Sequence, residues 1–190
     1  MQFKCRCGNV SGVIQQETEL QGLRFICMCK DCQAYAHFLG NPESILDANG
    51  GTEVVPVFPK LLQITKGFEH VRGVKLSEKT GLFRWYAGCC RSPIANSLPS
   101  QAGYIGLVAA RLGDLNRETL GPIRLRVNGE SGIPPLPEGT HKGTPSSWFF
   151  VILGQILRMY LKRWKRPNPF FDASNKPIAP VEVLVSPPKF

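Results

Sequence analysis

The chain has 190 residues, of which 43 % are hydrophobic, and this is typical of one globular domain with a hydrophobic core, or of one domain with an appendage. Its formal net charge of +9 suits anionic ligands, lipids or nucleic acid, but no motif with base-reading geometry accompanies that charge. Sixteen prolines and nineteen glycines favour short strands and turns over long helices, and no repeat or low-complexity tract is present.

The first elements are two predicted strands that flank cysteine-bearing turns. Residues 8–14 and 23–26 have the composition of short strands. Cys5 and Cys7 precede the first of them, and three more cysteines follow the second. The cysteines are therefore expected at strand ends and in tight turns.

Cys27, Cys29 and Cys32 place three thiols within six residues, which is close enough for one soft metal ion. A short helix is predicted from Cys32 to Phe38, and the run 40–42 ends it.

The middle of the chain predicts a series of further short strands. They cover residues 54–57, 61–65, 71–76 and 82–86, and glycines and prolines separate them. The vicinal pair Cys89-Cys90 follows the last of them. The elements up to this point predict a mainly β protein that metal holds together.

The last third begins with a segment too rich in proline and glycine for regular structure, from Gly132 to Pro145. A basic amphipathic helix is predicted next, over about residues 146–165, with Pro167 as its stop signal. Its apolar run is shorter than the roughly 20 residues that a membrane-spanning helix needs. We therefore expect no transmembrane segment.

Three roles are open for this helix. It can pack on the domain or in a homodimer interface, lie on an anionic membrane, or contact nucleic acid. No acidic residue occurs between Glu138 and Asp172, so much of the positive charge gathers around the helix. Basic residues at a helix C-terminus also complement its dipole without any partner.

The clustering of all seven cysteines favours metal over disulfides. Their count is odd, the chain is long for a disulfide scaffold, and Met1 leads into a charged start with no apolar secretory segment. These features favour a reducing, cytoplasmic environment. Zinc is the expected ion, with an iron–sulfur cluster as the alternative for such thiol-rich sites.

The order of these motifs resembles the family of glutathione-dependent formaldehyde-activating enzymes (GFA) and centromere protein V (CENP-V). The residues that carry the resemblance lie between about 3 and 97: Cys5-x-Cys7-Gly8, then Cys27-x-Cys29-x-x-Cys32, then Cys90-x-Ser92-Pro93. The resemblance implies a zinc-dependent β-tent domain of short stacked sheets over residues 1–130. The last third departs from the family's pattern, and we expect residues 131–190 to form a C-terminal helical extension packed on the same domain.

The resemblance also implies two zinc sites. Cys27, Cys29 and Cys32 match the family's catalytic ligands, whereas Cys5, Cys7 and Cys90 match three of its four structural ligands.

The fourth structural ligand does not match, because Ala87 stands where the family has a cysteine. Cys89 is the natural substitute, but adjacent residues of a strand point to opposite faces. Cys89 and Cys90 can share one ion only if the backbone turns sharply between them, and Gly88 could allow such a turn. Otherwise Cys89 faces the other site or stays a free thiol.

A zinc ion held by three thiolates activates water weakly but suits the capture of another thiol. The resemblance accordingly implies a carbon–sulfur lyase that acts on a small thiol adduct such as one of glutathione. Proton transfer would then need an acid–base residue, for which Asp31 and His37 are the nearest candidates. Asp31 can instead cap the following helix, and His37 can be an ordinary packed or surface residue.

Arg84, Tyr86 and Asn96 are candidates for substrate binding. Arg84 and Tyr86 combine a cation and an aromatic ring just before the vicinal cysteines, where a carboxylate-bearing peptide could be held. They can equally be ordinary residues of a half-buried strand, and Asn96 can simply form a turn hydrogen bond.

The leading functional hypothesis is thus a zinc-dependent carbon–sulfur lyase whose partner is a small thiol or thiol adduct. The alternative is a non-enzymatic, zinc-stabilised interaction module whose basic helix binds a partner, an anionic membrane or nucleic acid. A redox or metal-sensing role is a third hypothesis, if Cys89 and Cys90 are free and oxidise together.

Overall fold

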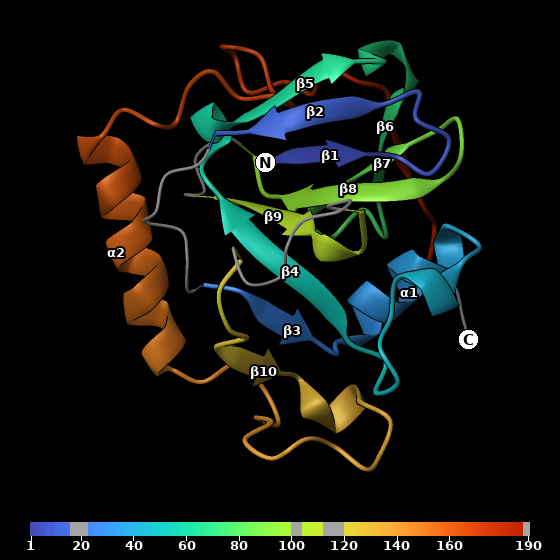
Figure 1. Cartoon of the computed structure of the whole chain (residues 1–190), viewed down its shortest axis with the longest axis vertical. Coiled ribbons are helices and arrows are strands. Elements are labelled where there is room, and N and C mark those ends of the chain that lie inside the picture. Colours follow the sequence, from blue (N-terminus) through green and yellow to red (C-terminus); the bar gives the residue numbers. More distant parts are fainter. Residues whose placement is uncertain (16–22, 100–103, 112–119, 188–190) are drawn as a thin grey trace.

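The computed structural model of the chain describes residues 1–15, 23–99, 104–111 and 120–187. Its regular structure consists of two sheets, two α-helices and several short 3₁₀ helices (Figure 1). The prediction of a mainly β protein with a helix on the C-terminal side is confirmed.

The smaller sheet has three antiparallel strands in the order β1-β2-β5. These strands are β1 (Gln2–Lys4), β2 (Ser11–Ile14) and β5 (Leu62–Lys66).

The larger sheet has eight strands, antiparallel except for the parallel edge pairs β10–β3 and β11–β6. In spatial order its strands are β10 (Leu125–Val127), β3 (Phe25–Cys27), β4 (Thr52–Val57), β9 (Ile105–Val108), β8 (Ser92–Ser97), β7 (Phe83–Ala87), β6 (Val71–Lys75) and β11 (Val181–Val183). Short 3₁₀ helices lie at Pro42–Ser44, Pro59–Leu61, Phe68–His70, Ala109–Arg111 and Gly129–Ser131.

The main hydrophobic core joins the small sheet to one face of the large one. Phe3 and Leu62 of the small sheet belong to the same buried cluster as Trp85 and Leu107 of the large sheet. Successive strand residues point to opposite faces, so Tyr86, next to Trp85, belongs to a second cluster on the other face.

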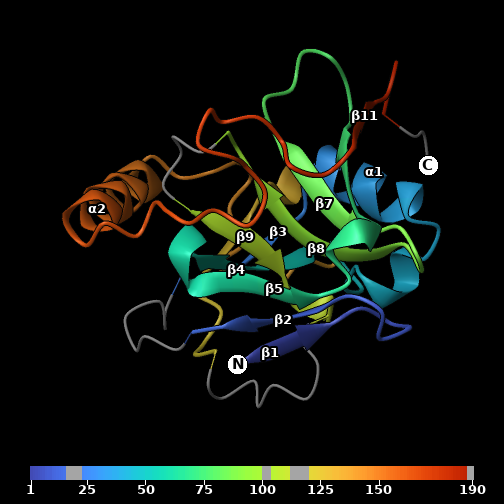
Figure 2. The ribbon, with the colours of Figure 1, turned by 90° about the horizontal axis from the view of Figure 1, so that it is seen from above.

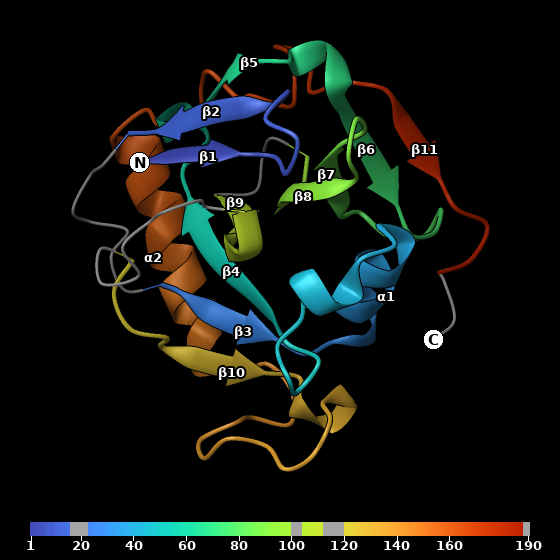
Figure 3. The same cartoon turned by 45° about the vertical axis from the view of Figure 1, so that its right-hand side comes forward.

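Helix α1 (Lys30–Phe38) covers that other face. Its buried residues Ala34, Tyr35 and Ala36 pack with Val74 and Tyr86 of the sheet. Figure 3 shows α1 beside the strands β6, β7 and β8. The helix directly follows β3, so the turn that carries the three-cysteine motif is held between a strand of the large sheet and a helix on its face.

Helix α2 (Ser147–Leu161) ends four residues before the predicted end near residue 165, because the chain forms a Schellman motif there. Arg163 adopts a left-handed backbone (φ 54°), and the backbone N–H of Trp164 donates to the carbonyl of Met159. Trp164 turns inward and packs with Met159, Phe58 and Leu61. None of the helices in the described ranges is long and apolar enough to cross a membrane.

The residues after α2 return to the main core. The Phe170 ring stacks on the indole of Trp85 at a centroid distance of 4.6 Å, and Phe171 meets the same indole edge-on. β11 then adds to the large sheet beside β6. The proline-rich segment before α2 is tied to the domain. The Asn49 side chain donates hydrogen bonds to the backbone carbonyls of Ile133 and Pro135, which hold this segment against the domain surface.

Candidate metal centres

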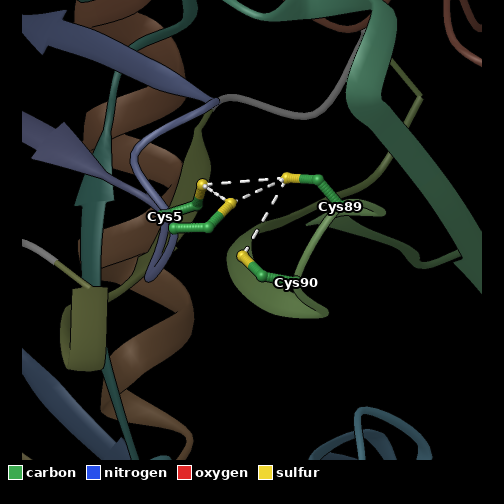
Figure 4. A group of neighbouring side chains, drawn as sticks. Cys5, Cys89 and Cys90 are labelled. Atoms are coloured by element: carbon green, nitrogen blue, oxygen red, sulfur yellow. Dashed lines mark hydrogen bonds between the residues drawn. The ribbon is translucent and has the colours of Figure 1, made fainter.

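The first cluster contains four thiols from two turns. Cys5 and Cys7 lie in the turn between β1 and β2, and Cys89 and Cys90 lie in the turn between β7 and β8. Their sulfur atoms all lie within 4.8 Å of one another. Figure 4 shows the thiols of Cys5, Cys89 and Cys90 pointing toward one another from the two turns.

Local backbone geometry explains why the first turn gathers its thiols. The backbone N–H of Cys5 donates to the carbonyl of Val10, and the N–H of Val10 donates to the Cys5 sulfur at 3.2 Å. Gly8 has a φ of 76°, a conformation that a side chain would disfavour. This tight turn replaces the first part of the strand that residues 8–14 predict, and β2 begins only at Ser11.

The second turn answers the question about the vicinal pair. Residues 88–91 form a turn in which the left-handed residue is Arg91 (φ 54°), not Gly88. Cys89 and Cys90 both direct their sulfur atoms into the cluster, at 4.0 Å from each other. The backbone N–H of Arg6 donates to the Ser92 hydroxyl at 3.0 Å, which holds the two turns together.

The spacing of the four thiols suits a tetrahedral metal site. The sulfur of Cys7 lies 3.5 Å from that of Cys5 and 3.3 Å from that of Cys89, and Cys5 and Cys89 are 3.9 Å apart. Sulfur atoms around a tetrahedral zinc ion lie roughly 3.8 Å apart, given Zn–S distances of about 2.3 Å. The four-cysteine cluster therefore fits zinc.

The thiol pKa values show how crowded this cluster is. Burial, with the thiols of Cys7 and Cys90 nearby, raises the pKa of Cys5. Burial also acts to raise the pKa of Cys90, but hydrogen bonds from Ser92 and Cys7 outweigh it and lower that pKa to about 6. Four adjacent thiols cannot all ionise without a counter-charge, and a divalent cation supplies one.

The second cluster contains three thiols at the start of α1. Cys27 ends β3, Cys29 is the N-cap of the helix, and Cys32 lies in its first turn. Their sulfur atoms also lie within 4.8 Å of one another. Cys27 and Cys32 are buried and Cys29 is partly exposed, so the cluster is reached from solvent at one side.

No fourth histidine, cysteine or carboxylate of the described residues joins these three thiols. The hydrogen bond with Cys27 lowers the pKa of Cys29, but the hydrogen bond with Cys32 and burial outweigh it and raise that pKa to about 11. For Cys32, the hydrogen bond with Cys27 and burial outweigh the lowering effect of Cys29 and raise the pKa to about 11. The positive end of the α1 dipole lies at the same place and favours negative charge on sulfur. The three-cysteine cluster thus fits a soft cation that keeps one coordination position for another ligand.

Two side chains from distant strands and turns contact the sulfurs of the three-cysteine cluster. The Asn128 amide donates to the sulfur of Cys27 at 3.3 Å, and the guanidinium of Arg84 donates to the sulfur of Cys32 at 3.9 Å. Arg84 is only 2 % exposed, and its guanidinium also donates to the side-chain amide oxygen of Asn96 at 3.3 Å. No sequence pattern points to Asn128, which lies 101 residues from Cys27.

Arg84 has no carboxylate partner among the described residues. A guanidinium stays protonated in proteins, and a buried charge needs compensation. Its neighbours are the Cys32 sulfur, the Asn96 amide and the ring of Tyr35, whose centroid lies 5.3 Å away. The cysteine cluster is therefore the nearest group that could carry the compensating negative charge.

The other sequence candidates lie in different places. Asp31 and His37 are exposed residues of α1, and neither joins the thiol cluster. Cys29, not Asp31, occupies the N-cap position. Asn96 lies in β8 opposite Arg84 and not in a turn.

Tyr86 faces a separate part of the molecule. Its hydroxyl donates to Glu182 at 3.2 Å, and it lines a surface cavity of about 460 Å³ together with Arg72 and Arg91. Tyr104 is a residue that the sequence analysis did not single out. Burial, and to a lesser extent the charge of Cys27, raise the pKa of Tyr104.

Comparison with known proteins places the chain in a family but gives it no activity. A family model described as "Family of unknown function (DUF6151)" matches residues 1–182. No curated protein matches. A solved structure described as the crystal structure of a Rhodobacter sphaeroides protein is 17 % identical, covers 65 % of this chain and 97 % of its own, and superposes with a TM-score of 0.46. That likeness is too weak to carry an argument.

Proposed function

Because the chain belongs to the DUF6151 family, whose function is unknown, we propose a function from its two cysteine clusters. The protein binds two zinc ions, one structural and one open to a ligand, and uses the open site to capture a small thiol. The reaction we propose is of the carbon–sulfur lyase type, on an adduct of an aldehyde with a glutathione-like thiol.

The single observation that carries this proposal is the difference between the clusters. One offers four sulfur ligands, which complete a tetrahedron, and the other offers three. A four-cysteine site is closed and stabilises the fold. A three-cysteine site leaves a position where an external sulfur can bind.

The buried cation beside the open site supports the same interpretation. Three thiolates and one zinc ion carry a net charge of −1, and Arg84 next to Cys32 carries +1. The pair is neutral as a whole, which makes its burial acceptable. Arg84 therefore balances the negative charge of the metal site, and the hydrogen bond to Asn96 holds its guanidinium in place.

Bound zinc would supply a positive centre that holds the substrate sulfur as a thiolate. In the cleavage direction the hydroxyl of the adduct R–S–CH₂OH loses its proton and the C–S bond breaks, with the electron pair passing to sulfur. Formaldehyde leaves, and the proton returns to the sulfur to give the thiol. Among the chain's own residues, Tyr104, whose pKa responds to the charge of Cys27, and the exposed Asp31 are our candidates to carry that proton.

The resemblance to the GFA and CENP-V family agrees with this proposal. The resemblance implies a β-tent fold and the assignment of one catalytic and one structural zinc ion. The odd number of clustered cysteines separately supports a reducing, cytoplasmic compartment. His37 and Tyr86 remain predictions as catalytic and substrate-binding residues, respectively, because His37 is exposed and Tyr86 faces the Glu182 side of the sheet.

The test is metal content and thiol binding on protein purified without added metal. We expect two zinc equivalents for the wild type and one for Cys29→Ser, which should remain folded. In the cobalt-substituted protein, added glutathione should change the visible absorption of the wild type and leave that of Cys29→Ser unchanged. The wild type should then release formaldehyde from S-hydroxymethylglutathione.

The outcomes separate the parts of the proposal. One zinc equivalent that survives in Cys29→Ser would show that the three-cysteine cluster holds no metal, and the lyase proposal would fail. Two equivalents with no spectral response to thiols would leave two structural sites and would also exclude thiol capture.

A further inference from the structure

Helix α2 presents an apolar face to solvent. Six large side chains of this face are between 50 and 75 % exposed: Phe149, Phe150, Leu153, Leu157, Tyr160 and Leu161. Phe149, Leu153, Leu157 and Leu161 recur every four residues and so form one stripe along the helix. We call these six residues the α2 apolar face.

Little of α2 is buried against the protein. Met159 is the buried residue of the helix, and Trp148 meets Phe25 edge-on. Gln155 lies on the same side, with its carbonyl oxygen buried and without a hydrogen-bond partner. The domain thus buries α2 only in part, and the helix lies beside the two sheets rather than between them (Figure 2).

The space over the α2 apolar face is open. Gly154 lies on the solvent side between Phe150 and Leu157, and a Cβ built on it would meet no atom within 4 Å. An apolar stripe of this size on a protein surface usually marks an interaction site.

Positive charge borders the stripe. Lys162, Arg163 and Lys165 follow the helix directly, and no acidic residue occurs between Glu138 and Asp172. Lys162 and Arg163 are exposed. Lys165 lies over the ring of Tyr160 at 5.5 Å, which places its charge next to the apolar face.

We propose that the α2 apolar face binds the surface of an anionic lipid bilayer. An interfacial helix buries its apolar side at the headgroup boundary, and its basic residues attract anionic lipids. The helix is about 22 Å long at 1.5 Å per residue, too short to span the hydrocarbon core, so it lies in the plane of the membrane.

Charge distinguishes this partner from a second copy of the chain. A bilayer of anionic lipid complements Lys162, Arg163 and Lys165. A second α2 would bring only more positive charge, since the segment 139–171 has no acidic residue to pair with it.

The experiment is sedimentation of the zinc-loaded, full-length protein with vesicles. We expect binding to mixed phosphatidylserine–phosphatidylcholine vesicles, weaker binding at high salt, and little binding to phosphatidylcholine alone. Leu153→Glu should weaken binding by about tenfold or more, because it removes an inserted apolar side chain. Lys162→Glu should weaken it through charge.

Two matched variants control for these changes. Val185→Glu makes a similar apolar-to-acidic substitution at a fully exposed residue outside α2, and Lys79→Glu makes the same charge change at another exposed lysine. Both should bind to vesicles much more like the wild type. Leu153 is half exposed, so its substitution should leave zinc content and circular dichroism unchanged.

The proposal is overturned if the wild type does not bind to the phosphatidylserine vesicles, or if Leu153→Glu binds as well as the wild type. Light scattering measures the molar mass in solution and so tests the competing partner, a second copy of the chain. A wild-type dimer that Leu153→Glu converts to a monomer, with no vesicle binding, would identify the α2 apolar face as a homodimer interface instead. This test is independent of Cys29, so its failure leaves the lyase proposal untouched.

Discussion

Arg84 illustrates how a single residue can report on a metal site. It is almost fully buried, and its described polar contacts are the Cys32 sulfur and the Asn96 amide. A permanent cation in such a place is tolerated if the sulfur cluster is anionic. The stability of strand β7, which carries Arg84, should therefore depend on whether the three cysteines carry negative charge.

We predict that Arg84→Met lowers the zinc affinity of the three-cysteine cluster by about 10–100-fold, as loss of a residue that hydrogen-bonds to a metal ligand typically does. Arg84→Lys keeps the charge without the planar donor group and should lie in between. Competition with a chromophoric chelator measures the affinity.

Arg72→Met is the matched control, because Arg72 donates only to nearby carbonyls in the described contacts and lines the cavity beside Tyr86. It should bind zinc at the three-cysteine cluster like the wild type. Unchanged affinity in Arg84→Met would mean that the guanidinium does not compensate the cluster's charge.

At the level of elements, the tail after α2 contributes directly to the main core. Phe170 is fully buried and its ring lies nearly parallel to the Trp85 indole, with an interplanar angle of 2°. We predict that Phe170→Ala lowers the free energy of unfolding by about 3–5 kcal/mol, because it removes a buried ring and leaves a cavity. Denaturant unfolding measures the change.

Phe149→Ala makes the same substitution on the exposed face of α2 and should change the free energy of unfolding by less than about 0.5 kcal/mol. Equal effects of the two variants would contradict the packing of the tail on Trp85. The comparison also separates the role of residues 166–187 in stability from that of α2.

The strands that the sequence predicted are those with a clear composition signal. Residues 54–57, 61–65, 71–76 and 82–86 correspond to β4, β5, β6 and β7 within one or two residues at each end. Helix α1 contains the predicted run from Cys32 to Phe38.

The strands that the sequence missed lack such a signal. β8 contains Pro93 and Asn96, which are rare in strands, and β9 is an unbroken buried run without alternation. β10 and β11 have three residues each and form parallel pairs at the sheet edges, so long-range pairing creates them and local composition does not.

The candidate sites were likewise predictable only where the signal is local in the sequence. Short-range spacing identified all seven cysteines as candidate ligands, because neighbouring thiols are visible in the sequence. Arg84 and Asn96 come near the three-cysteine cluster only through the register of β7 and β8, and Asn128 only through the β10–β3 pairing. Such partners depend on the complete topology.

At the scale of the whole molecule, the two cysteine clusters connect different structural elements. The four-cysteine cluster joins the β1–β2 turn of the small sheet to the β7–β8 turn of the large sheet. The three-cysteine cluster joins β3 to the first turn of α1, which the backbone already connects. Loss of metal should therefore affect the fold differently at the two sites.

We predict that a strong chelator removes zinc in two steps. The first equivalent should leave the three-cysteine cluster with little change in circular dichroism, because that site has an open position where the chelator can enter. The second should leave the four-cysteine cluster together with a cooperative loss of structure, since metal binding there contributes to folding free energy. Zinc release and circular dichroism are followed in the same titration.

Cysteine variants assign the steps. Cys29→Ser should lack only the first step, whereas Cys90→Ser should begin with lower stability and lack the second. A single step in the wild type, with both equivalents leaving as structure is lost, would contradict a division between an open and a closed site. It would mean instead that both clusters hold the fold together and that neither offers a position for a substrate thiol.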